Sequence, residues 1–311
     1  MKAIVCTKYG PPEVLKLADV EKPKAKNDEV LIKIFATAVT QSDIFIRGSK
    51  LPIQYWLPMR LLLGLTKPRQ PIIGVVLAGE IESVGKDVKR FRKGDQVYGF
   101  SGFALGAYAE YKCMSVKDSL QGCLAIKPSN LTYEEAAAAA YGGLLALQYL
   151  TKGNIKRGQK VLIYGASGSI GTIAVQIAKH LGAEVTGVCS TTNLELVKSL
   201  GADRVIDYTK ENSIKSGDHY DFILDAVGRL KTSNLKKQCK KALTKNGKYI
   251  SVDDGDLKLR SEPLVRLKVL IEAGHVKPVI DRCYPLEQMV EAHRYVGEGH
   301  KKGNVVITTG T

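Results

Sequence analysis

Residues 160–189, KVLIYGASGSIGTIAVQIAKHLGAEVTGVC, decide the fold of this chain. A β-branched stretch at 160–164 leads into a glycine-rich turn, and apolar side chains then recur at three- and four-residue steps through 169–181. The first pattern predicts a strand, the second predicts an amphipathic helix, and residues 184–189 form the next strand-like run. A strand, a helix and a strand in this order predict one βαβ unit of a parallel sheet.

The same alternation continues to residue 252. Residues 194–200 are helix-like, and residues 204–206, 220–225 and 248–252 are short apolar runs typical of buried strands. Strands that alternate with helices predict an α/β fold with a doubly wound parallel sheet.

The first 125 residues have a different pattern. Short apolar runs recur at 29–37, 73–81, 92–100 and 107–113, and the second and third contain glycine. Such runs predict strands, and glycines inside them indicate bulges or tight curvature. We therefore expect a compact, mainly β domain ahead of the parallel sheet. Helix-forming sequence at 134–140 and again at 144–150 lies between the two parts.

The glycine-rich turn carries the clearest chemical signal. Glycine lets the backbone approach a pyrophosphate, and a helix N-terminus offers free N–H groups and a partial positive charge to phosphates. A tight turn without a ligand is the alternative, but the strand, the helix and the following strand all fall where dinucleotide binding requires them. The predicted cofactor-binding residues of this turn are Gly165, Ala166, Ser167, Gly168, Ser169, Ile170 and Gly171.

The composition is that of a globular protein: 311 residues, of which 44% are hydrophobic. The six cysteines form no C-x-x-C pair, so we expect reduced thiols in a cytoplasmic protein and neither a disulfide framework nor a zinc ribbon. The first apolar run is too short for a signal peptide. The most apolar stretch, 72–81, falls short of the roughly 20 residues of a membrane span, so no membrane partner is expected.

The net charge of +15 brings nucleic acid into question as a partner. The excess of Lys and Arg divides almost evenly between residues 1–125 and residues 126–311, without a basic arm. The basic clusters are short: Lys236-Lys237, Lys240-Lys241 and Lys301-Lys302. Such clusters are usually solvated faces, so we expect no nucleic-acid partner.

Further motifs occur in the order of a known family. They are Gly85–Gly99 (GKDVKRFRKGDQVYG), Leu200–Asp203 with Asp207-Tyr208, Asp225–Gly228 (DAVG) and Gly299–Ile307 (GHKKGNVVI). Together with the glycine-rich turn they resemble zinc-free medium-chain dehydrogenases/reductases, close to the quinone oxidoreductase branch, over nearly the whole chain.

The resemblance implies a GroES-like catalytic β domain over residues 1–125, completed by residues 275–311. It also implies a Rossmann NADP-binding domain over residues 126–274, with the active site in the cleft between the domains. In such a domain Ala226 and Val227 would contact the cofactor.

The resemblance also bears on metal binding. Zinc-dependent relatives supply a cysteine near residues 38–43 and a Gly-His-Glu further on, where this chain has Thr40 and Gly74-Val75-Val76. Valine cannot ligate zinc, and none of the five histidines has a recognised metal-ligand spacing. The four-cysteine zinc lobe is also missing, so no metal is expected.

Without zinc, charge that develops on a substrate oxygen must be met by hydrogen bonds or by a general acid. Thr40 is a candidate because it occupies the position where the branch often has Asn. Tyr141, at the domain junction, and Tyr55, in an inserted segment at 49–69, are candidate proton donors, although buried tyrosines are more often packing residues. Asp43 matches a family aspartate, and we favour a structural role for it.

The sequence departs from the branch at three places. The segment Thr40–Asp43 lacks the usual Asn and Pro, and Leu145 replaces a common Thr. The connection from Val252 to Leu264 is short, whereas relatives have further strand and helix material there, near the dimer interface. A homodimer is therefore only weakly favoured. The inserted segment at 49–69 is either a functional loop or a short surface helix.

The cofactor preference depends on the residues immediately after the strand at 184–189. An NAD site places Asp or Glu roughly 20 residues beyond the glycine turn, where the carboxylate holds the ribose 2′-hydroxyl and repels a 2′-phosphate. Here the chain has Ser190, Thr191, Thr192 and Asn193. Ser190, Thr191 and Asn193 can donate hydrogen bonds to a phosphate, and Tyr208 is placed by resemblance beside the adenosine. The sequence predicts a moderate preference for NADPH, because close relatives often carry Arg where Thr192 stands.

Together with these features, the family resemblance implies an NADPH-dependent, zinc-free reductase of quinones, enones or other activated carbonyl compounds, which are small molecules. A zinc-free alcohol dehydrogenase or carbonyl reductase is the alternative of the same class. An NADPH-binding scaffold with little catalysis is the alternative of a different class, because fold alone does not establish function.

Overall fold

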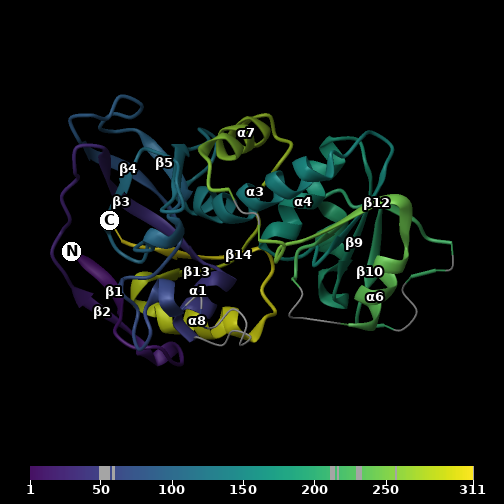
Figure 1. The fold of residues 1–311 in the computed structure, drawn as a ribbon, viewed down its shortest axis with the longest axis horizontal. Helices are drawn as coiled ribbons and strands as arrows, with labels where there is room; N and C mark the ends of the chain where they lie inside the picture. The colour runs from purple at the N-terminus through teal and green to yellow at the C-terminus, as the bar shows by residue number, and fades with distance from the viewer. Residues whose placement is uncertain are drawn as a thin grey trace. The chain divides into compact units, whose positions relative to one another are not determined.

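The computed structural model describes residues 1–48, 57, 60–210, 214–215, 217–228, 233–255 and 258–310. The chain forms two compact units, each with its own sheet (Figure 1). Unit 1 comprises Met1–Ala140, Lys258–Lys268 and Ile280–Thr311, and unit 2 comprises Tyr141–Leu257 and Val269–Val279.

Unit 1 is built on a seven-stranded sheet of order β13-β14-β3-β4-β5-β7, in which β6 also pairs with β3. Its strands are β3 (Glu29–Val39), β4 (Val76–Val84), β5 (Gln96–Phe100), β6 (Tyr111–Ser115), β7 (Cys123–Ile126), β13 (Ile280–Pro285) and β14 (Asn304–Thr308). All neighbours are antiparallel except β13 and β14. A separate antiparallel pair consists of β1 (Lys2–Cys6) and β2 (Leu15–Asp19). The predicted mainly β domain is confirmed.

The strand β3 organises this sheet, because it pairs with β4, β6 and β14. The buried cluster on it includes Val30, Ile32, Ile34, Leu77, Ile81, Phe91 and Val97. A Cβ on Gly79 would lie 2.1 Å from the Lys33 carbonyl oxygen, so only glycine allows β3 and β4 to approach here. The pairing of β3 with β4 shifts register twice, as the glycines of this region predict.

The C-terminal segment returns to unit 1, as the family resemblance implies. Strand β14 pairs antiparallel with β3, with Val306 opposite Ala38. Strand β13 extends the sheet beyond β14. The sheet of unit 1 therefore combines β3 to β7 from the first part of the chain with β13 and β14 from its C-terminal part.

Two predicted strands begin later than the sequence pattern indicates. Gly74 has a φ of +98°, a backbone conformation that interrupts a regular ladder. Beside it, Tyr108 N–H donates to the Ile73 carbonyl at 3.0 Å and Ala107 N–H donates to the Gly74 carbonyl at 3.1 Å. The two segments are hydrogen-bonded to each other without forming regular strands, and β4 and β6 begin only after them.

The helical elements of unit 1 are α1 (Gln41–Gly48), α8 (Met289–Glu298) and the short turns η1 (Pro12–Val14), η2 (Gly102–Ala104) and η4 (Leu286–Gln288). Helices α1 and α8 pack together. In the inserted segment, Arg60–Leu63 are helical, and the Arg60 guanidinium lies 3.3 Å from the centroid of the Tyr9 ring. The Tyr9 hydroxyl donates to the Gly64 carbonyl at 2.8 Å, so this part of the insertion is fixed to the loop after β1.

Unit 2 has a five-stranded sheet of order β10-β9-β8-β11-β12, with every pair parallel. Its strands are β8 (Lys160–Tyr164), β9 (Glu184–Cys189), β10 (Arg204–Asp207), β11 (Tyr220–Asp225) and β12 (Leu243–Ser251). The chain reverses its direction of progress between β8 and β11, which makes this the switch point where open α/β sheets bind ligands. The predicted doubly wound sheet is confirmed.

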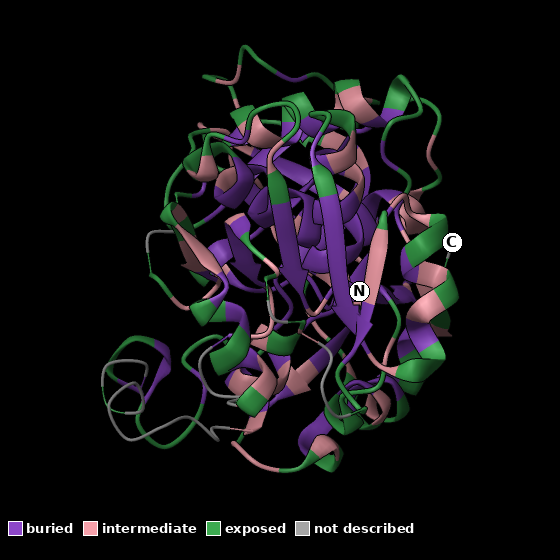
Figure 2. Ribbon diagram, turned by 90° about the vertical axis from the view of Figure 1, so that its right-hand side faces the viewer, coloured by how far each residue is buried: buried purple, intermediate pink, exposed green. Residues whose placement is uncertain are grey.

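The helices that lie wholly within unit 2 are α4 (Ser169–His180), α5 (Leu194–Ser199) and α6 (Asn234–Lys241), with a short turn η3 (Thr191–Asn193). The residues of α3 (Tyr133–Gly153) and α7 (Ser261–Glu272) are divided between the two units. Strands are mostly buried, whereas exposed residues gather on helices and loops (Figure 2). No helix among the described residues has both the length and the apolar character for crossing a membrane.

Helix α3 is one continuous helix, although its sequence suggests two helical stretches separated by Gly142-Gly143. A Cβ on Gly142 would lie 2.2 Å from the Ser169 carbonyl oxygen. Glycine therefore does not interrupt the helix. It permits α3 to pack tightly on the start of α4.

The division into units differs from the predicted boundaries, since unit 1 extends to Ala140 and takes in Lys258–Lys268. The start of α3 belongs there because the Tyr133 ring stacks on Phe35, with ring centroids 4.6 Å apart. The start of α7 belongs there because the Tyr98 hydroxyl donates to the Leu264 carbonyl at 2.6 Å.

Candidate cofactor site and catalytic residues

The glycine-rich turn comes after β8 at the carboxyl edge of the parallel sheet. Gly165 has a φ of +84°, which favours glycine. The N–H groups of Gly165 and Ala166 both donate to the Val188 carbonyl, at 3.0 and 2.9 Å, and thus fix the turn to β9. A Cβ on Gly171 would lie 2.1 Å from the Gly165 carbonyl oxygen, so the start of α4 packs directly on the turn.

The turn leaves room for an anion at the start of α4. A Cβ on Gly168 would have a single neighbour within 4 Å, the Gly165 carbonyl oxygen at 3.5 Å. The first bond near the helix start runs from Thr172 N–H to the Gly168 carbonyl at 2.9 Å. The N–H groups of Ile170 and Gly171 precede it and have no acceptor within the helix. The first turn carries no acidic residue, so these residues fit a dinucleotide pyrophosphate.

The residues predicted to contact the adenosine side gather around Asn193. Its side-chain N–H groups donate to Ser167 Oγ at 3.2 Å and to Ser190 Oγ at 3.1 Å. Asn193 is 6% exposed, and its Oδ1 has no hydrogen-bond partner in the described structure. The glycine-rich turn and the loop after β9 are thus joined at one place.

A carboxylate to which the sequence analysis assigned no role lies beside this group. Asp207, at the carboxyl end of β10, is 9% exposed and accepts a hydrogen bond from the Thr191 hydroxyl at 2.5 Å. Strand β10 is the neighbour of β9, so the ends of the two strands meet at the same edge. That adjacency is the signal that could have found Asp207. Tyr208, next in the chain, is 50% exposed.

A second carboxylate to which no role was assigned, Asp225, shapes the loop after β11. It is fully buried and accepts hydrogen bonds from Val227 N–H at 3.2 Å, Gly228 N–H at 3.1 Å and the Tyr249 hydroxyl at 2.6 Å. The Lys236 ammonium lies 2.6 Å from the same carboxylate. Ala226 and Val227, predicted from the family resemblance, are therefore held in a fixed backbone conformation.

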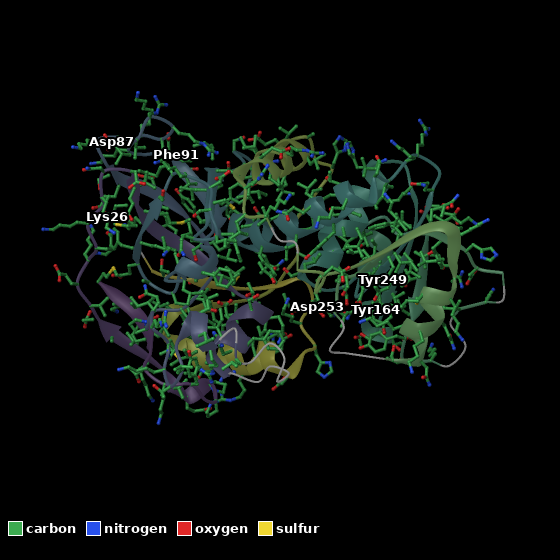
Figure 3. The ribbon with its side chains drawn as sticks, viewed as in Figure 1. Lys26, Asp87, Phe91, Tyr164, Tyr249 and Asp253 are labelled. Atoms are coloured by element: carbon green, nitrogen blue, oxygen red, sulfur yellow. The ribbon has the colours of Figure 1, made fainter. Side chains whose placement is uncertain are left out.

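This loop lies at the switch point of the sheet. A Cβ on Gly165 would lie 2.5 Å from Val227 Cγ2, so the ends of β8 and β11 are in contact. Tyr164, Tyr249 and Asp253 come from β8, from β12 and from the turn after β12, and lie at this side of unit 2 (Figure 3). The predicted cofactor residues of unit 2 thus share one edge of the sheet.

In unit 1, Thr40 and Asp43 form a capping box at the start of α1. Asp43 Oδ2 accepts from Thr40 N–H at 2.8 Å, and Thr40 Oγ1 accepts from Asp43 N–H at 3.3 Å. The Thr40 hydroxyl also donates to Asp43 Oδ2, at 2.6 Å. Thr40 is 4% exposed and its hydroxyl hydrogen is engaged, so it can offer a lone pair to a ligand more readily than a proton. The geometry gives Asp43 the structural role that the sequence favours.

Asp43 belongs to a buried group of titratable residues. Burial raises the pKa of its carboxyl to about 6, although hydrogen bonds from Thr40 and Tyr108 act in the opposite direction. The Tyr108 hydroxyl also lies 3.1 Å from His293 Nε2 on α8. Burial, aided by the charge of Arg47, lowers the pKa of His293 to about 3, so the imidazole is neutral.

The two predicted proton donors are placed differently. Tyr141 is half-buried on α3, and Tyr55 lies outside the described residues. Leu145, on the same helix, is buried, as is Val75, which stands where zinc-dependent relatives have histidine. No group of three or more His, Cys, Asp or Glu side chains suited to a metal ion occurs in the part of the chain that the structure describes.

Known families match most of the chain. The alcohol dehydrogenase GroES-like domain matches residues 26–125, and zinc-binding dehydrogenase domains match residues 169–270 and 255–307. The 2-methylene-furan-3-one reductase of Solanum lycopersicum is 35% identical over 99% of this chain and 79% of the relative. The chloroplastic NADPH-dependent alkenal/one oxidoreductase of Arabidopsis thaliana is 33% identical, with the same coverage.

A solved structure agrees with these relatives. The quinone oxidoreductase from Coxiella burnetii superposes with a TM-score of 0.86 at 29% identity, covering 100% of this chain and 99% of that one. A GroES-like unit and a Rossmann unit with an intact glycine-rich turn define an oxidoreductase with a nicotinamide dinucleotide site. The chain belongs to the medium-chain dehydrogenase/reductase family and is quinone oxidoreductase-like.

Proposed function

We propose that this protein reduces the activated C=C or C=O bonds of small enones, alkenals or quinones with NADPH. The observation that carries the proposal is the turn at 165–171, whose glycines open onto free N–H groups at the start of α4 and whose Ser167 is joined to Ser190 through Asn193. The activities for which the relatives are named, alkenal/one reduction and quinone reduction, support the substrate class.

Different residues of the chain serve binding and chemistry. The start of α4 binds the pyrophosphate, and the Asp225-held loop at 226–228 provides a rigid wall at the switch point. When bound, the dihydronicotinamide supplies a hydride to an electrophilic carbon of the substrate. Charge on the substrate oxygen is then met by a protein donor, for which Tyr141 and Tyr55 are our candidates. Thr40 serves as a hydrogen-bond acceptor for the bound ligand, because its own hydroxyl hydrogen is donated to Asp43.

We also propose that the reaction needs no zinc and that NADPH is preferred over NADH. Thr40 and Val75 stand in the positions of zinc ligands, and neither side chain suits zinc. No carboxylate comes after β9 within residues 190–193, where an acid would repel a 2′-phosphate.

The test is NADPH oxidation by the purified protein against a panel of alkenals, enones, quinones and simple aldehydes. Turnover with conjugated substrates and little with simple aldehydes is the expected result. Turnover with simple aldehydes alone would favour a carbonyl reductase. Tight NADPH binding without turnover of any compound would favour a scaffold and contradict the proposal.

A further inference from the structure

The cluster around Asp207 has a defined direction of hydrogen bonding. Asp207 Oδ2 accepts from the Thr191 hydroxyl at 2.5 Å, and Oδ1 accepts from the Thr209 N–H at 2.9 Å and from the Thr209 hydroxyl at 2.7 Å. Thr191 Oγ1 and Thr209 Oγ1 are also 2.9 Å apart. Because a carboxylate only accepts, both hydroxyl hydrogens point toward Asp207.

Asp207 is ionised at neutral pH. Burial raises the pKa of Asp207. The hydrogen bonds from Thr191 and Thr209 and the charge of Lys210 together lower it by more than burial raises it, so the pKa lies below the usual value. The Lys210 ammonium is 3.9 Å away and its side chain is 68% exposed, so water screens its charge. The Asp207 cluster therefore keeps a net negative potential.

This charge lies where the cofactor ribose is expected. Thr191 stands roughly 20 residues beyond the glycine-rich turn, the place from which an NAD site presents its acid to the ribose 2′-hydroxyl. Thr191 is exposed, and its hydroxyl hydrogen is turned away from solvent toward Asp207. It therefore presents a lone pair, which can accept from a ribose hydroxyl but cannot bind a phosphate oxygen.

The other polar side chains near this position are also partly engaged. The Asn193 amide hydrogens point to Ser167 and Ser190. Lys198 pairs with Glu195 at 3.0 Å. Ser190 Oγ lies 3.3 Å from Thr192 Oγ1, and these two hydroxyls remain as the main neutral donors.

We infer that Asp207 is a specificity-determining residue of the cofactor site, which acts through Thr191 to favour a ribose 2′-hydroxyl and to limit the preference for a 2′-phosphate. In an NAD site the acid follows the second strand of the sheet, whereas here the acid is Asp207 on the neighbouring strand β10. Asp207 does not contact the ribose itself but orients the Thr191 hydroxyl that does. The inference rests on the proposed cofactor site but not on the reductase activity.

The experiment measures the binding of two nucleotides by calorimetry. Adenosine 2′,5′-bisphosphate and 5′-AMP represent the adenosine halves of NADPH and NADH, and their affinity ratio reports the 2′-group alone. Asp207→Asn removes the charge and lets its amide donate to Thr191, which frees the Thr191 hydroxyl hydrogen. We expect the ratio of bisphosphate to AMP affinity to rise about fivefold or more.

The matched control is Asp203→Asn, which removes one charge at the opposite end of β10, where Asp203 pairs with Lys179 at 2.7 Å. It should leave the ratio within about twofold of the wild type. A ratio unchanged by Asp207→Asn, or raised equally by Asp203→Asn, overturns the inference while the cofactor site stands. Wild-type protein that binds neither nucleotide overturns both.

A second variant tests the same inference without removing Asp207. Thr191→Val keeps the carboxylate but deletes the lone pair that meets the ribose, so AMP affinity should fall about fivefold while bisphosphate affinity changes less. If Asp207→Asn fails to fold, this variant decides the matter. AMP affinity that stays within about twofold of the wild type contradicts the inference.

Discussion

Ser190 is the residue at which the cofactor preference can be reversed. It comes directly after β9, and Ser190→Asp would place a carboxylate beside the ribose 2′-position. The wild type should favour NADPH roughly tenfold or more in kcat/KM, which corresponds to about 1.4 kcal/mol, and the variant should favour NADH. Both cofactors are compared with one substrate at identical salt. Ser199→Asp, an exposed change on α5, is the control, and a variant that still prefers NADPH contradicts the expectation.

Asp43 should give the protein a measurable pH dependence of stability. Its folded pKa of about 6 lies above the ordinary value of 3.8, so the stability contributed by its protonated form is present below pH 3.8 and is lost as pH rises through 6. Relative to Asp43→Asn, the wild type should lose up to about 3 kcal/mol of unfolding free energy between pH 4 and pH 7.

Urea unfolding at several pH values measures this difference. Subtracting the two curves removes the contribution of His293, whose lowered pKa destabilises both proteins in acid. Asp19→Asn, at an exposed position of β2, should behave like the wild type. A constant difference between wild type and Asp43→Asn across this range would show that the carboxyl titrates normally.

At the residue scale, local patterns were predictable and contacts between distant strands were not. Motif spacing predicts the glycines of the turn and Asn193 as cofactor residues. Asp207 occurs in a family motif but was given no role, because its contact with Thr191 spans 16 residues of sequence and depends on the pairing of β9 with β10. Thr40 stays a predicted site residue, and the direction of its hydrogen bond depends on its contact with Asp43.

At the scale of elements, the contact of α3 with α4 depends on Gly142. A methyl group there would lie 2.2 Å from the Ser169 carbonyl oxygen, so Gly142→Ala must displace one helix. Overpacking of this kind costs about 1–3 kcal/mol, and we expect the variant to lose stability and NADPH affinity together. Thermal unfolding and NADPH fluorescence titration measure both effects.

Gly297→Ala is the control for this prediction. Gly297 lies within α8, and a Cβ there would have no neighbour within 4 Å. Alanine should be neutral or stabilising at that position, because glycine is the poorer helix former. Equal unfolding temperatures for Gly142→Ala and the wild type would mean that the helices can move apart at little cost.

The prediction of elements succeeded where periodicity was strong. Strands β8 to β11 and helix α4 begin and end close to the predicted residues. The strands β4 and β6 begin later than predicted because the chain around Gly74 is hydrogen-bonded to the chain around Tyr108 outside the regular ladder. No local sequence pattern reveals this contact. The two stretches of α3 looked separate because glycine usually weakens a helix, whereas here it serves packing.

For the whole molecule, we expect activity without metal. Elemental analysis of purified protein should find no stoichiometric zinc, since Thr40 and Val75 replace the ligands of zinc-dependent relatives. Chelators should leave NADPH oxidation unchanged. Loss of activity on chelation, then recovery with zinc, would overturn the expectation.

Assembly is a second prediction at this scale. Strand β12 is the last strand on its side of the five-stranded sheet, and a sheet edge invites pairing with another copy. We expect a weak homodimer, measured by light scattering over a range of concentrations. A monomer at high concentration would show that the short connection after Val252 has removed the interface.

The pairing of β14 with β3 has a consequence for synthesis. A ribosome releases the strands of unit 2 before β13 and β14, so the parallel sheet can form while the first sheet still lacks its final partners. Until then β3 presents an unpaired apolar edge, which is a hazard for aggregation. Premature termination ahead of β13 should therefore yield insoluble chains, and nascent molecules should depend on chaperones until translation ends.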